Sequence, residues 1–134
     1  MQDYRKLHVW RRSHRFVVAV YGIIADFPRE ERFELTAQLR RALVSIPTNI
    51  AEGRSRNSEK SFAAFVDIAS GSAAETEYLL LLAHEVGYIG AEAHAPLAGE
   101  IDEIRRMLHA LHAHLARSAH RRPLRGRSTL TANG

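Results

Sequence analysis

The sequence predicts an all-α protein, an up-down-up-down antiparallel four-helix bundle, and three observations support this fold. Apolar residues recur at alternating steps of three and four in four separate segments, which is the spacing of a helix face in a bundle. Prolines, glycines and short polar runs separate these segments. Short connections favour antiparallel neighbours. No segment shows the alternating pattern of a β-strand.

The first predicted helix covers residues 4–26. It ends at Phe27-Pro28, because the residue before a proline is pushed out of the α region. Positions at helical spacing along one face of this segment are Leu7, Trp10, His14, Val17, Tyr21 and Ile24.

The second predicted helix covers residues 29–52. Pro28 opens it, since a missing N–H costs nothing there, and Gly53 is placed to end it. Pro47 falls inside the pattern and removes the bond to the carbonyl of Leu43, which predicts that the helix is kinked there or split in two. The apolar face consists of Leu35, Leu39, Ala42, Leu43, Ile46 and Ile50.

The third predicted helix covers residues 58–87, with Asn57 or Ser58 as its N-cap. Its middle, residues 69–74, consists of small side chains that let a neighbouring helix approach closely. The fourth covers residues 92–118. The bundle therefore occupies residues 1–118, and residues 119–134 form a basic tail that we expect to be disordered.

The net charge of +4 is unevenly distributed along the chain. Residues 117–134 hold five arginines and no acid, whereas residues 1–116 hold 14 basic and 15 acidic groups, a net of −1. Arginine suits phosphate because its planar fork donates two parallel hydrogen bonds. A solubilising tail and an ordinary solvated N-terminal face would account for the same charges. The candidate nucleic-acid-binding residues are Arg5, Lys6, Arg11, Arg12, Arg15, Arg54, Arg56, Arg117, Arg121, Arg122, Arg125 and Arg127.

A line of polar residues follows the second predicted helix beside its apolar face. These residues fall within an arc of roughly 80° on a helix of 3.6 residues per turn. We interpret them as a hydrogen-bonded network between helices or subunits. A binding site is the alternative. Glu75 or Glu77 of the third predicted helix could supply a counter-charge to Arg41. This polar stripe comprises Gln38, Arg41, Ser45, Asn49 and Glu52, with Glu75 opposite.

The sequence shows no catalytic or cofactor motif. Its serines lie in no Gly-x-Ser-x-Gly frame, and no phosphate loop or dinucleotide fingerprint is present. His109 and His112 could share an ion, but no carboxylate accompanies them at the spacing of di-iron bundles. We therefore predict no enzyme activity, no metal and no cofactor. A hydrolase built around Ser45 and Glu52 stays open as an alternative.

The absence of cysteine fits a reducing compartment, and no apolar run is long enough to span a bilayer. The N-terminus lacks the pattern of a signal peptide. We therefore expect a cytoplasmic protein with no membrane partner.

Two motifs lie on the second predicted helix, Leu35-Thr-x-Gln38-Leu-Arg-Arg41-Ala and Ser45-Ile-Pro-x-Asn49-Ile-Ala-Glu-Gly53. With them, residues 4–115 resemble the 23S ribosomal RNA intervening-sequence proteins, also called the four-helix-bundle protein family. The flanking motifs are Leu7-x-Val-Trp10, Phe27-Pro-x-x-Glu31, Phe65-x-x-Ile-Ala69-x-Gly-Ser72-x-x-Glu75 and Gly87-Tyr88.

This resemblance implies a bundle that assembles into a homopentameric ring and has no established enzymatic activity. Some members are encoded inside insertions in bacterial 23S rRNA genes. Distant relatives include accessory proteins of diversity-generating retroelements, which are basic pentameric bundles associated with nucleic acid and reverse transcriptase.

Charge and resemblance together predict a non-enzymatic homo-oligomer that binds nucleic acid, RNA in first place or DNA, through clustered arginines. The alternative is an oligomeric scaffold or assembly protein that acts on a protein partner and binds no nucleic acid.

Overall fold

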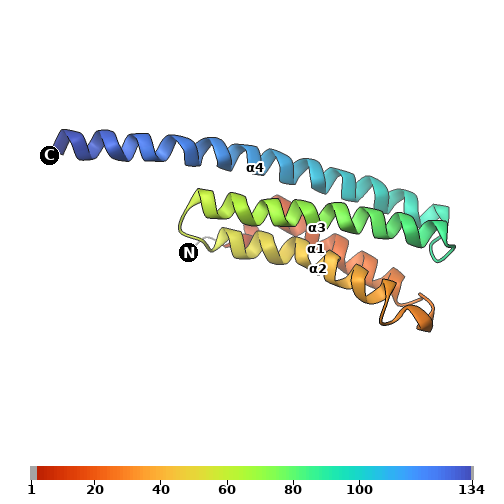
Figure 1. The fold of residues 1–134 in the computed structure, drawn as a ribbon. Coiled ribbons are helices and arrows are strands. Elements are labelled where there is room, and N and C mark those ends of the chain that lie inside the picture. The colour runs from red at the N-terminus through yellow and green to blue at the C-terminus, as the bar shows by residue number, and fades with distance from the viewer. Residues whose placement is uncertain (1–2, 134) are drawn as a thin grey trace.

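The computed structural model describes residues 3–133, with side chains through residue 120. Within that range the chain forms four α-helices, two short 3₁₀ turns and no strand, which confirms the all-α prediction (Figure 1). In chain order the elements are η1 (Tyr4–Lys6), α1 (His8–Ile24), η2 (Arg29–Glu31), α2 (Leu35–Arg54), α3 (Glu59–Glu85) and α4 (Ala91–Asn133).

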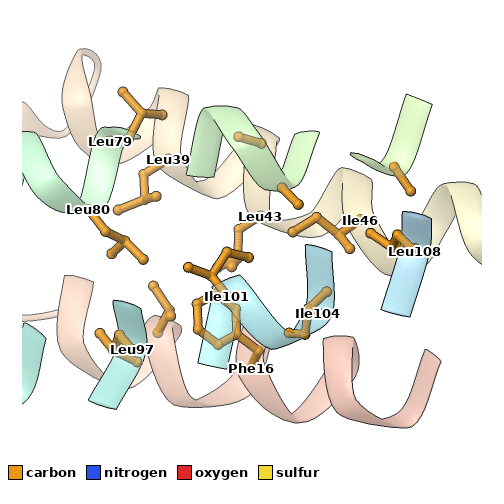
Figure 2. Close-up of a cluster of buried hydrophobic side chains, with 14 of the residues drawn as sticks. Phe16, Leu39, Leu43, Ile46, Leu79, Leu80, Leu97, Ile101, Ile104 and Leu108 are labelled. Atoms are coloured by element: carbon orange, nitrogen blue, oxygen red, sulfur yellow. The ribbon is translucent and has the colours of Figure 1, made fainter. Parts of the chain in front are cut away.

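The four helices pack around one apolar core. The largest contacts join α2 to α3 and α3 to α4, and α1 makes smaller contacts with α2 and α4. Figure 2 shows Leu43 of α2, Phe16 of α1 and Ile101 of α4 meeting in this core. Each large apolar side chain removed from water contributes about 1.5–3 kcal/mol. The largest fully buried apolar side chains are Ile24, Leu39, Leu43, Ile46, Ile50, Leu80, Ile101, Ile104, Leu108, Val20 and Val66.

The first two helices are shorter than the sequence predicts. Leu7 has an extended backbone (φ −73°, ψ 127°), which separates η1 from α1. α2 begins at Leu35 rather than at residue 29, because Glu34 is not helical (φ −113°, ψ −107°). The Glu31 carboxylate accepts a hydrogen bond from the Leu35 N–H at 3.3 Å. A side chain therefore satisfies one of the free N–H groups at the start of α2.

α2 continues through Pro47 to Arg54 without being split. Gly53 is inside the helix, so the prediction that it ends the helix is wrong. A Cβ at Gly53 would lie 2.7 Å from Cδ1 of Phe62 and 2.8 Å from Cβ of Phe65. The glycine therefore allows the start of α3 to approach α2 closely.

α3 begins as predicted, with the Ser58 hydroxyl accepting a hydrogen bond from the Ser61 N–H at 3.1 Å. α4 ends later than predicted: it is helical to Asn133, where the sequence predicts a disordered tail from residue 119. The helix continues past Pro123, although an interior proline removes a backbone donor and crowds the carbonyl four residues earlier. Among the described helices, none is long and apolar enough to cross a membrane.

Candidate nucleic-acid interface

The predicted basic clusters, which are far apart in the sequence, gather at one end of the molecule. Figure 1 shows the N-terminus, the connection between α2 and α3, and the projecting part of α4 at the same end. Lys6 lies in η1, Arg56 lies between α2 and α3, and Arg117 lies on α4. We call this region the basic end. It comprises Arg5, Lys6, Arg54, Arg56 and Arg117.

Two of the predicted arginines are engaged within the fold. Arg11 donates from Nη1 to the carbonyls of Arg5 and Lys6, at 3.2 and 2.7 Å. Arg12 donates from Nε and Nη2 to the carboxylate of Glu100 on α4, at 2.9 and 2.6 Å. Both side chains are half-buried. They stabilise η1 and the α1–α4 packing, and we assign them no phosphate contact.

Other predicted residues are more accessible. Arg5 is exposed but pairs with Asp3, with Nε 3.1 Å from Oδ1. Hydrogen bonds from Arg5 hold the pKa of Asp3 below its ordinary value. Lys6, Arg15 and Arg117 are exposed to solvent.

The arginines after α2 lie against aromatic rings. The guanidinium carbon of Arg54 is 5.9 Å from the ring centroid of Phe62, and that of Arg56 is 4.7 Å from the centroid of Phe65. Arg56 is exposed and also lies 4.0 Å from a carboxylate oxygen of Glu52. A cation–π contact favours one position of the Arg56 guanidinium group, and because this side chain is exposed it can still donate hydrogen bonds to a phosphate.

The last described side chain is that of His120. Four predicted residues follow it in α4, namely Arg121, Arg122, Arg125 and Arg127. Their predicted role in nucleic-acid binding falls outside the described side chains and stays a prediction.

Charge is separated between the two halves of the bundle. Residues 3–56, which include α1 and α2, hold eleven Arg and Lys against six Asp and Glu, a net charge of +5. Residues 57–120, which include α3 and most of α4, hold four against nine, a net charge of −5. The two charges cancel over residues 3–120, so the sum hides this separation, which is seen only once the helices are placed in space.

The polar stripe connects α2 to α3. Asn49 donates from Nδ2 to the Ser45 carbonyl and hydroxyl oxygens, at 2.8 and 2.9 Å. The Ser72 hydroxyl donates to the Ser45 hydroxyl at 2.7 Å, and Gln38 donates to Glu75 at 3.3 Å. In this chain the stripe therefore forms hydrogen bonds between two neighbouring helices.

Two expectations for the polar stripe need correction. Glu77 pairs with Arg105 of α4 at 2.9 Å, so it is no counter-charge for Arg41. Arg41 itself is exposed and forms no ion pair with any described side chain.

A shallow groove follows the outer face of α2, and no pattern in the sequence indicates it. Its volume is about 450 Å³. The guanidinium carbon of Arg40 lies 5.6 Å from the ring centroid of Tyr21, which joins α1 to this surface. The groove, called the α2 groove below, is lined by Tyr21, Arg40, Arg41, Val44, Ser45, Thr48 and Asn49.

The histidines occupy separate places. His109 and His114 are exposed, and His14 stacks on Trp10 with ring centroids 5.0 Å apart. His84 and His94 stack beside the α3–α4 connection, with ring centroids 4.6 Å apart, a pair that no spacing in the sequence indicates. The described residues contain no group of three or more His, Asp or Glu that could hold a metal ion.

These features define a class: an all-α protein of four helices with a basic end and an unequal distribution of charge between its two halves. The model of the family described as 23S rRNA-intervening sequence protein matches residues 5–110, and the chain belongs to this family.

A solved structure is similar over most of the chain. It is the crystal structure of a protein with unknown function from the S23 ribosomal protein family of Bacteroides thetaiotaomicron, with 28% sequence identity and a TM-score of 0.68. The match covers 77% of this chain and 96% of that one. A search of curated proteins finds no match.

Proposed function

We propose that this protein is a non-enzymatic homo-oligomer that binds RNA through its basic end. The observation that carries the proposal is that three separate segments with basic residues lie at one end of the bundle (Figure 1). They are the N-terminal segment with Lys6, the α2–α3 connection with Arg56 and the C-terminal half of α4 with Arg117. An up-down-up-down order of the helices produces this convergence, because alternate connections and both termini then share an end.

The physical basis is electrostatic. Each phosphate neutralised by Lys or Arg releases condensed counterions, so that several contacts together give useful affinity. Isolated exposed charges contribute little, whereas a ring of subunits repeats each charge and adds the fields. Five subunits is the number that the family resemblance implies.

RNA is proposed before DNA because the family description refers to a 23S rRNA intervening sequence. Arg56, which lies over the Phe65 ring and is exposed, presents a planar donor group that suits the phosphate of either polymer. The binding experiment therefore compares RNA with DNA directly.

An electrophoretic mobility-shift series in increasing salt tests the proposal. The probes are single-stranded RNA, duplex RNA and duplex DNA of one sequence. We expect binding at low salt that weakens as salt rises, with a slope of about −0.7 per contact for single strands and −0.9 for duplex DNA. Absence of binding at low salt would contradict the proposal. Unchanged binding by a chain that ends at residue 120 and carries Lys6→Gln and Arg56→Gln would also do so.

A scaffold that binds a protein partner is the second candidate, and exposed apolar side chains favour it. Phe33 is 78% exposed and Tyr78 is 60% exposed. The scaffold function predicts that Arg41→Ala or Glu52→Ala changes the oligomer mass in light scattering. Unchanged mass together with RNA binding by the wild type would argue against it.

A further inference from the structure

We propose that three aromatic side chains near the N-terminus form a stacking surface for the unpaired bases of single-stranded RNA. The inference rests on the RNA binding of the proposed function and names the form of RNA that the basic end accepts. The surface, called the aromatic row, comprises Tyr4, Trp10 and His14.

The aromatic row is assembled from η1 and the start of α1. The ring of Tyr4 meets the ring of Trp10 at an angle of 65°, with centroids 4.9 Å apart. His14 follows Trp10 by four positions on the same face of α1, and the two rings are nearly parallel, at an angle of 7° with centroids 5.0 Å apart. Trp10 also packs against the core, so the middle of the row is fixed to the bundle.

His14 forms the outer end of the row. Its side chain is exposed, and no hydrogen bond or ion pair of the described part of the chain involves it. Trp10 covers one face of the imidazole ring, and no other described ring stacks on the opposite face. The next residue along this line of the helix is Val18, which is 59% exposed. A flat ring placed on His14 would therefore extend the stack and cover an apolar side chain that otherwise faces water.

A nucleobase has the shape and chemistry that this position accepts. Proteins that bind single-stranded nucleic acid stack its bases on the rings of Trp, Tyr, Phe and His, and every base has a π-face that can do so. The bases of a duplex are already paired and stacked on one another, so a ring on the surface of a helix does not reach their faces. The aromatic row therefore selects an unpaired strand.

The charges near the row suit the phosphates of such a strand. α1 holds three arginines and no acid. Arg15, next to His14, is exposed, and so is Lys6 of the basic end, two positions after Tyr4. The guanidinium carbon of Arg5 lies 6.0 Å from the Tyr4 ring centroid. Cations thus accompany both ends of the row, and they can bind the phosphates on either side of a stacked base.

Strands with and without bases test the stacking. The probes are a single-stranded RNA, an abasic ribose-phosphate strand of equal length and a duplex RNA of the same sequence. Affinity is measured by fluorescence anisotropy of a dye on the strand in a salt series. Unlabelled strands are then added while the emission of Trp10, the only tryptophan of the chain, is recorded.

Three variants separate a ring from other roles of this position. His14→Ala removes the outer ring, and His14→Phe keeps a ring without the imidazole nitrogens. The control is His109→Ala, which removes an exposed histidine of α4 outside the row. Circular dichroism checks the helix content of each variant, and His14→Gln replaces His14→Ala if the latter unfolds.

We expect single-stranded RNA to bind about tenfold more tightly than the abasic strand and to quench Trp10 emission, which the abasic strand should leave unchanged. His14→Ala should weaken single-stranded RNA binding about tenfold at every salt concentration without changing the salt slope, because no phosphate contact is lost. His14→Phe and His109→Ala should keep the wild-type affinity. Duplex RNA should bind equally well to the wild type and to His14→Ala.

Equal affinities for the single-stranded RNA and the abasic strand would overturn the inference, and so would unchanged Trp10 emission or an unchanged affinity of folded His14→Ala for single-stranded RNA. A His14→Phe variant as weak as His14→Ala would also overturn it, because the position would then need a histidine rather than a ring. So would a loss of duplex affinity equal to the loss for the single strand.

The proposed function is judged separately by the salt series. Salt-dependent binding of the strands without any effect of His14 would leave the basic end as a phosphate-binding site while removing the aromatic row from it. Absence of binding by every strand at low salt would overturn both the row and the proposed function.

Discussion

Arg12 of α1 and Glu100 of α4 form a two-bond ion pair, with Nε and Nη2 2.9 and 2.6 Å from the carboxylate oxygens. The pair joins the first and last helices at a place where α1 makes comparatively small contacts. It explains how a helix with an arginine-rich face is fixed to the bundle, and it shows that a basic side chain near the N-terminus can have a purely structural role.

We expect Arg12→Ala to lower the free energy of unfolding by about 1 kcal/mol. A charged hydrogen bond contributes more when buried, but both side chains are near one-third exposed and water screens the pair. Urea unfolding measures the change. Arg15→Ala is the control, because Arg15 is exposed, and its effect should stay within about 0.5 kcal/mol. Equal effects of the two substitutions would contradict the role of the ion pair.

The same pair predicts a dependence on pH. Hydrogen bonding to Arg12 lowers the pKa of Glu100 below its ordinary 4.5. The carboxylate therefore stabilises the fold at pH values above 4.5, and this contribution is lost as the pH falls through the lowered pKa. The stability difference between wild type and Glu100→Gln should be constant near neutral pH and shrink in acid. A difference that persists in strong acid would refute this assignment.

Tyr88→Phe should destabilise the protein, because it removes a side-chain hydrogen bond between two connections of the fold. The Tyr88 hydroxyl donates to Glu31 at 2.8 Å and so links the α3–α4 connection to the turn before α2. The hydrogen bond to Glu31 raises the pKa of Tyr88 above 10, and its contribution is lost only as the pH rises through that raised value. Thermal unfolding at neutral pH compares this variant with Tyr4→Phe, whose hydroxyl forms no hydrogen bond with a described residue. Equal effects would show that the bond contributes nothing.

Gly53→Ala should destabilise the protein by about 1–3 kcal/mol, because the added methyl group would collide with Phe62 and Phe65. Gly22→Ala should instead stabilise it by about 0.5–1 kcal/mol, since a Cβ there meets nothing within 4 Å and alanine favours a helix. Urea unfolding measures both changes. A lower midpoint for Gly53→Ala and a higher one for Gly22→Ala than for the wild type would support the close approach of α2 and α3. A stabilising Gly53→Ala would contradict it.

Much of the core could be predicted from the sequence. The spacing of Leu39, Leu43, Ile46 and Ile50 places them on one helix face, and all four are fully buried. The boundaries were harder to predict, because they depend on contacts outside the helix itself. The Glu31 side chain sets the start of α2, and Gly53 serves the approach of α3 rather than the end of a helix.

The candidate site was only partly predictable. The arginine clusters are visible in the sequence, but their convergence depends on which ends of the helices lie together. Arg12 and Glu100 are 88 positions apart, and no local pattern relates them. The opposite charges of the two halves cancel over residues 3–120, so a net charge does not reveal them. The α2 groove forms only where Tyr21 of α1 lies beside Arg40 of α2, and no local pattern in the sequence predicts that contact.

The most direct test of the basic end is RNA affinity by fluorescence anisotropy in a salt series, with two variants that each lose three positive charges. One carries Lys6→Gln, Arg56→Gln and Arg117→Gln at the basic end, and the other carries Arg29→Gln, Arg32→Gln and Arg106→Gln elsewhere on the surface. The basic-end variant should bind RNA more weakly, with a salt slope smaller by about 2–3, and the other should remain close to the wild type. Equal affinities and slopes for the two variants would contradict RNA binding at the basic end.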